Sequence, residues 1–190
     1  MRTTLLAIAS ALIAVPAAAQ SDGPRRGFFL SVGMGGGSVG VTCPQCGDVP
    51  GDRLNGVSGY LRFGGAVSPR LQVGVEGSGW IKNSDGLERR IAGASLVFIG
   101  YPSATGGFWV KSGVGGLRAV VENDIAAVVG EGLMFQAGIG YDIPLGTGAA
   151  LTPYANYIYS TGVAAAINSV STGFDLNPNI LQVGLAITIP

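Results

Sequence analysis

Residues 133–142 read LMFQAGIGYD, and every second side chain in this stretch is apolar from the first leucine to the tyrosine. Successive side chains of a β-strand point to opposite faces, so the stretch would present one apolar face and one face of methionine, glutamine, glycine and aspartate. Residues 181–189, LQVGLAITI, repeat the pattern. A tilted strand needs about ten residues to cross a bilayer, which is the length of both stretches. They predict membrane-spanning strands.

Eight runs of this kind follow one another along the chain. They span residues 27–41, 54–66, 70–81, 91–101, 107–118, 132–143, 149–160 and 179–189. The gaps between them alternate between long and short, which is typical of barrels with tight turns on one side of the membrane and longer loops on the other. The long gaps are 42–53, 82–90, 119–131 and 161–178. The sequence predicts an all-β, eight-stranded antiparallel up-and-down transmembrane β-barrel.

The first residues have the features of an export signal. Arg2 gives a positive start, an uncharged apolar stretch runs from Leu5 to Val15, and the alanines at 17–19 supply a small-residue cleavage pattern. We expect residues 1–19 to be a cleaved signal peptide and 20–190 to form one barrel domain, which places the chain beyond the inner membrane.

The distribution of charge decides which face of the strands points outward. A soluble barrel of lipocalin type also has eight strands with one apolar face, but that face points inward. Only 12% of the residues are charged, whereas an ordinary soluble domain carries about twice that fraction. Within the strands, the charged residues lie on the face with glycine, serine and glutamine. An apolar face without charge indicates contact with lipid, because a charge at the bilayer midplane costs about 2–4 kcal/mol.

Four charged residues are therefore expected inside the barrel: Arg62, Glu76, Lys111 and Asp142. Two acids and two bases in a narrow lumen favour a neutralised ion-pair network, since buried charges persist when they are paired. A polar pathway for a small solute is the alternative interpretation.

Several aromatic residues fall near the ends of the predicted strands, where girdles form at the membrane interfaces. The candidates are Phe28, Trp80, Tyr101, Phe108, Trp109, Tyr141, Tyr157 and Tyr159. Ordinary strand aromatics explain the same residues equally well, because aromatic side chains favour strands in any case.

Two cysteines, Cys43 and Cys46, lie in the first long gap. In an exported protein the C-x-x-C spacing favours a local disulfide in an exposed loop. Zinc would need four ligands, and only Asp48 and Asp52 are near, so no metal site is predicted. The G-x-G-x-x-G match at 35–40 lacks the helix and the acidic residue of a dinucleotide site, so no cofactor is expected.

The chain contains no histidine, which excludes a Ser-His-Asp arrangement and most acid–base chemistry of barrel enzymes. We therefore expect no enzymatic activity. The nearly balanced charge also gives no indication of a nucleic-acid partner.

The strands resemble those of a known family. Residues 109–115 (WVKSGVG) and 136–141 (QAGIGY) are similar to strands of the small outer-membrane β-barrel proteins of Gram-negative bacteria, of the OmpA-like and OmpX-like surface-antigen kind. The resemblance implies a location in the outer membrane, with lipid and the barrel assembly machinery as partners. It also implies a structural or surface-interaction role, in which the four long gaps bind an extracellular ligand. Passage of small apolar molecules, as in OmpW-type proteins, and a soluble periplasmic binding barrel are the alternative functions.

Overall fold

Nine β-strands make up the regular structure of the described residues. The computed structural model describes residues 25–42, 52–84, 86–122, 127–146, 148–167 and 170–189. The strands are β1 (Phe28–Thr42), β2 (Leu54–Ser68), β3 (Leu71–Ser84), β4 (Leu87–Gly100), β5 (Phe108–Glu122), β6 (Ala127–Tyr141), β7 (Ile143–Pro144), β8 (Ala150–Ile167) and β9 (Val170–Ile189). In these ranges, no helix is long and apolar enough to cross a membrane.

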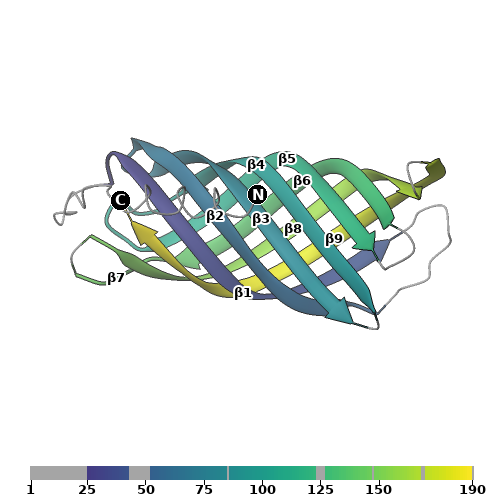
Figure 1. Cartoon of the computed structure of the whole chain (residues 1–190). Coiled ribbons are helices and arrows are strands. Elements are labelled where there is room, and N and C mark those ends of the chain that lie inside the picture. Colours follow the sequence, from purple (N-terminus) through teal and green to yellow (C-terminus); the bar gives the residue numbers. More distant parts are fainter. Residues whose placement is uncertain are drawn as a thin grey trace, which may run out of the picture.

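The eight long strands close into one antiparallel barrel (Figure 1). Each pairs with its neighbours in the chain, β1 pairs with β9, and β6 pairs with β8 across the short β7. The predicted fold class is confirmed. We call the end with the β2–β3 turn, β7 and the C-terminal end of β9 the inner end, and the end with the β3–β4, β5–β6 and β8–β9 hairpins the outer end.

The strands are longer at the outer end than the sequence predicted. The gaps at 82–90, 119–131 and 161–178 were expected to be loops, but most of their described residues continue the flanking strands. Valine is frequent in 119–131 and suits an extended chain, and pairing across each hairpin satisfies the backbone polar groups. The expected long loop is replaced by a strand hairpin at 82–90, and at 119–131 and 161–178 the structure shows the strand extension that the composition had left open beside short helices. The predicted signal peptide, Cys43 and Cys46 lie outside the described residues.

The two faces of the wall differ as the sequence predicted. Large apolar side chains point outward around the middle of the barrel and form an apolar belt of Val32, Met34, Val57, Leu61, Phe63, Val75, Leu96, Phe98, Val110, Val114, Leu133, Phe135, Ile139, Leu181, Val183 and Leu185. Val75 is 59% exposed, whereas its neighbour Glu76 is 1% exposed. A soluble barrel would have the opposite arrangement, so this exterior is suited to lipid.

The lumen is filled by three layers of side chains. An apolar layer at the outer end contains Val39, Trp80, Ile91, Leu117, Met134, Ile158, Val163 and Ile180. A polar layer in the middle contains the buried charged residues. A mainly aromatic layer at the inner end contains Phe29, Tyr60, Ile99, Tyr101, Trp109, Tyr154 and Ala186. Eight strands enclose just enough space for side chains, and here side chains occupy most of that space.

This layering corrects the predicted aromatic girdle. Trp80, Tyr101 and Trp109 are buried in the lumen instead of lying at the membrane interface, while the other five candidates are exposed on the outside. Position along a strand suggested an interface, but the alternation of faces determines the direction of each side chain. Trp80 shares a face with Glu76, and Trp109 shares one with Lys111.

Candidate functional site

The centre of the lumen holds a buried ion-pair cluster of three residues. The Arg62 Nε donates to Glu76 Oε2 at 2.6 Å, and Lys111 Nζ donates to the two Glu76 oxygens at 2.6 and 2.9 Å. Arg62 and Glu76 are register partners on β2 and β3, whereas Lys111 reaches them from β5. All three side chains are nearly inaccessible to solvent. Sequence reasoning named these three residues, and the fold brings them together.

Further contacts hold the three side chains in place. Lys111 Nζ also donates to Gln136 Oε1 at 3.1 Å, and the Gln136 amide donates to Ser95. The Arg62 guanidinium lies 4.6 Å from the centre of the Tyr60 ring. Buried polar groups with fixed partners of this kind rigidify a core. The cluster closes the middle of the lumen with a carboxylate that is already engaged by two cations.

Asp142, the fourth predicted member, lies elsewhere. It follows β6 at the inner end and accepts hydrogen bonds from Thr152 Oγ1 (2.8 Å), the Tyr101 hydroxyl (3.0 Å) and Trp109 Nε1 (3.1 Å). No ion pair within 4 Å joins it to the other three, so the structure does not bring all four charged residues into one network. The partners of Asp142 are neutral donors from three different segments of the chain. The sequence alone does not indicate that these segments meet at Asp142.

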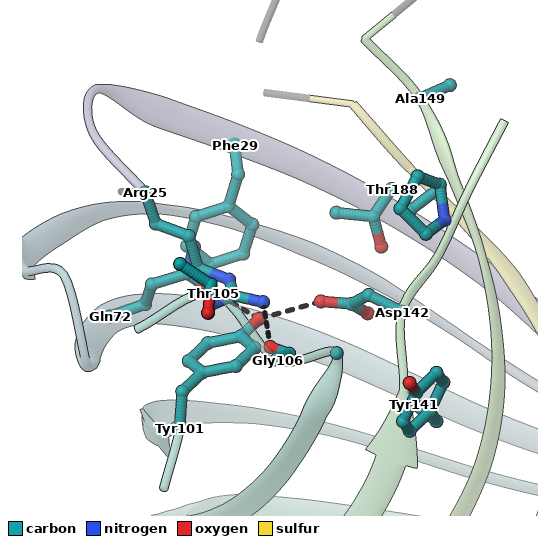
Figure 2. A pocket seen from close by; sticks show the side chains of 13 residues that line it. Arg25, Phe29, Gln72, Tyr101, Thr105, Gly106, Tyr141, Asp142, Ala149 and Thr188 are labelled. Carbon is teal, nitrogen blue, oxygen red and sulfur yellow. Dashed lines mark hydrogen bonds between the residues drawn. The ribbon is translucent and has the colours of Figure 1, made fainter. Parts of the chain in front are cut away.

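A cavity of about 330 Å³ opens beside Asp142 at the inner end (Figure 2). The Arg25 guanidinium lies 3.5 Å from the centre of the Tyr101 ring and donates to the carbonyls of Ala104 and Gly106. Burial and the Asp142 carboxylate raise the pKa of Tyr101, so its hydroxyl stays protonated and donates to Asp142. These contacts attach the segment before β1 to the turn before β5.

A second cavity, of about 230 Å³, lies at the outer end. Its lining is almost entirely apolar and comes from both sides of the barrel, with Trp80 and Ile91 on one side and Val163 and Pro178 on the other. Sequence reasoning missed this cavity because it assigned most of these residues to loops.

Metal binding and catalysis by a free carboxylate receive no support from the described residues. In the part of the chain that the structure describes, no group of three or more aspartate, glutamate, cysteine or histidine side chains could hold a metal ion. Glu76 is the buried carboxylate of the lumen, and its oxygens are occupied by Arg62 and Lys111.

Comparison with known proteins gives a fold and no closer relationship. No protein-family model and no curated protein matches the sequence. Among solved structures, Neisserial surface protein A is similar at 12% identity, with 85% of this chain and 96% of that chain covered and a TM-score of 0.56. The attachment invasion locus protein Ail of Yersinia pestis, in complex with the heparin analogue sucrose octasulfate, is similar at 11% identity, with 84% and 99% covered and a TM-score of 0.54.

These likenesses show the fold. The chain has the fold of the small outer-membrane β-barrels, as the sequence predicted. That fold and the apolar belt support a location in the outer membrane.

Proposed function

We propose that this chain is a non-conducting, non-enzymatic surface barrel of the outer membrane that acts through the outer ends of its strands. The observation that carries the proposal is the change of chemistry along the outer surface. Strands of 14–20 residues exceed the ten or so that a bilayer requires, and beyond the apolar belt their outward side chains become charged. The barrel therefore supports a rigid platform outside the lipid.

The charged band on this platform is organised by ion pairs across the strands. Arg90 on β4 is paired with Glu88, at 3.1 Å, and with Glu122 on β5. Arg118 lies 3.5 Å from Glu131 on β6. Exposed pairs of this kind add little stability, so the band is better suited to contact with a partner than to holding the fold.

We do not propose a sulfated sugar, the kind of ligand bound in the Ail structure, as the partner of this chain. That protein was solved with a sulfated sugar analogue. Here Arg90 and Arg118 of the outward band are paired with neighbouring glutamates, and a polyanion would have to displace these glutamates. We therefore favour an uncharged or mixed-charge protein surface as the partner.

The filled lumen supports a non-conducting barrel. The apolar, charged and aromatic layers follow one another along the axis, so a solute that enters the outer cavity meets buried side chains below it. Passage of apolar solutes through the lumen would require all three layers to move. The absence of histidine from the sequence and the engaged state of Glu76 support a non-catalytic role.

Two measurements test the proposal. Purified barrel in planar bilayers should give no stepwise ion conductance, and regular open-channel steps would contradict a closed lumen. Cells that display the barrel should bind a host-cell or bacterial surface, and shortening β8 and β9 beyond the belt by removing residues 162–178 should abolish that binding. Unchanged binding by a shortened barrel that still resists SDS until heated would contradict a role for the outer ends.

A further inference from the structure

The lumen-facing side of the outer end is the feature of this barrel that the proposed function leaves unused. The cavity there has a volume of about 230 Å³. Its lining includes Trp80, Arg89, Ile91, Ala119, Val163 and Pro178. Apolar side chains dominate this lining although the cavity opens toward water. An open apolar cavity on a surface that is otherwise charged is typical of a ligand site.

Two cations lie near this cavity: Arg89 lines it, and Lys82 is the register partner of Arg89. Lys82 and Arg89 are directly opposite each other in the β3–β4 register, and both follow the inward alternation of Trp80 and Ile91. Like charges at opposite positions repel each other. Neither side chain has a carboxylate of the described residues within 4 Å, and Arg89 donates only to the hydroxyl and carbonyl of Ser84.

The adjacent residue provides a comparison within the same strand. Arg90 points to the outside of the wall and is paired with two glutamates. Among the described residues, Arg90 on the outer side of the wall is therefore paired with carboxylates, while Lys82 and Arg89 on the lumen side are not. A local excess of positive charge beside an apolar cavity favours a ligand with an anionic end and an apolar body.

The cavity has a closed floor. Trp80 and Met134, which are 3% and 0% exposed, lie in the apolar layer, and the Arg62–Glu76–Lys111 cluster lies beyond them. A molecule that enters from outside is held at the mouth and does not pass through. The wall separates the cavity from the bilayer, so the occupant comes from the external medium.

We propose that the mouth of the barrel binds a single-chain anionic amphiphile, such as an alkyl carboxylate. The alkyl chain lies against Trp80, Ile91 and Val163, and the carboxylate is held by Lys82 and Arg89. Apolar burial provides the affinity, and the two cations select the anionic head group over a neutral one. This site is independent of the outward-facing band. The test of the site can therefore fail while the proposed function stands, and the reverse is also true.

Quenching of Trp80 fluorescence tests the site directly. The chain has two tryptophans, so W109F leaves Trp80, in the floor of the cavity, as the only reporter. The protein is placed in lipid nanodiscs and titrated with an alkanoate brominated at its chain end, and separately with the brominated alcohol of the same length. We expect the alkanoate to quench Trp80 with at least about tenfold higher affinity than the alcohol.

Three further variants, each in the W109F background, locate the binding. K82Q/R89Q should lower the affinity for the alkanoate to that for the alcohol. A119F should fill the cavity and abolish quenching by both probes. R118Q, which changes an outward-facing arginine on the strand that carries Ala119, should bind both probes unchanged. A heat-dependent shift in gel mobility shows that each variant is folded.

Three results would overturn the proposal. Equal quenching in every variant would show that the probe acts from the bilayer. Equal affinities for alkanoate and alcohol would exclude selection by the cations. Quenching that appears only after residues 43–51, between Val41 and Leu54, are replaced by a short linker would show that the chain itself occupies the mouth.

Discussion

Glu76 is the residue on which the middle of the lumen depends. It joins a register partner, Arg62, to a side chain two strands further around the barrel, Lys111. Removing one member of such a cluster leaves charges buried without a partner, which costs far more than the complete cluster contributes. The cluster thus fixes how β2, β3 and β5 are arranged around the lumen.

Neutralising this carboxylate should destabilise the barrel strongly. We expect Glu76→Gln to lower the free energy of unfolding by about 3–5 kcal/mol, because Arg62 and Lys111 lose their shared counter-charge. Urea titration of the barrel in lipid vesicles measures the change. The matched control is Glu131→Gln, which removes the exposed pair with Arg118 and should cost less than about 1 kcal/mol. Similar losses in the two variants would contradict a structural role for the cluster.

A fully apolar replacement of the cluster tests whether it serves stability at all. In the triple variant Arg62→Met, Glu76→Leu and Lys111→Met, no charge remains to be buried. We expect it to fold and to be within about 2 kcal/mol of the wild type, or more stable, in the same titration. A loss as large as that of Glu76→Gln would mean that the ion pairs themselves stabilise the barrel.

At the scale of single strands, β1 shows why glycine is frequent in this chain. Gly33 lies under the rings of Tyr60 and Tyr154, and a Cβ added there would overlap both. Gly36 points to the outside, where a Cβ would meet nothing within 4 Å. A narrow lumen can hold large aromatic rings only where the facing strand has no side chain.

Valine at these two positions should therefore have opposite consequences. We expect Gly33→Val to destabilise the barrel by about 1–3 kcal/mol through overpacking, because the added side chain would overlap the Tyr60 and Tyr154 rings. Gly36→Val should be neutral, since the added side chain points away from the lumen. Comparison of the two urea midpoints checks the prediction, and a neutral Gly33→Val would mean that the rings can rearrange.

At the scale of the whole molecule, the outer surface of the barrel has one zone suited to lipid and one suited to water. The apolar belt faces lipid, and the charged band begins where the belt ends. The same strands pass through both zones, so the position of a residue relative to the belt decides the cost of a charge.

Arginine substitutions on the outer surface should reveal this boundary. Val75, in the middle of β3, lies in the belt, and we expect Val75→Arg to cost about 2–4 kcal/mol in lipid vesicles. Val120, opposite Arg90 on the outer part of β5, lies at the level of the charged band, and Val120→Arg should cost at most about 1 kcal/mol. Equal costs at both positions would place the bilayer differently from the belt described here.

Much of this architecture follows from alternation alone. The period of two residues predicts the strands, the alternation of gaps predicts their antiparallel order, and the face that carries Arg62, Glu76 and Lys111 predicts the inside. These are properties of neighbouring residues, and local geometry determines them. Alternation also assigns Trp80 and Trp109 to the lumen, although their place near strand ends suggested the membrane interface.

The partners of the lumen side chains depend on closure of the barrel. Whether Asp142 meets Lys111 or Thr152 depends on strand register and stagger, which relate residues far apart in the chain. The apolar mouth likewise exists because β3 and β4 face β8 and β9 across a closed lumen. The sequence by itself therefore determined the strands, their faces and the membrane setting, since these follow from alternation along the chain. Only the tertiary structure decided which lumen residues meet and where the cavities lie, because closing a sheet into a barrel fixes distances that no local pattern contains.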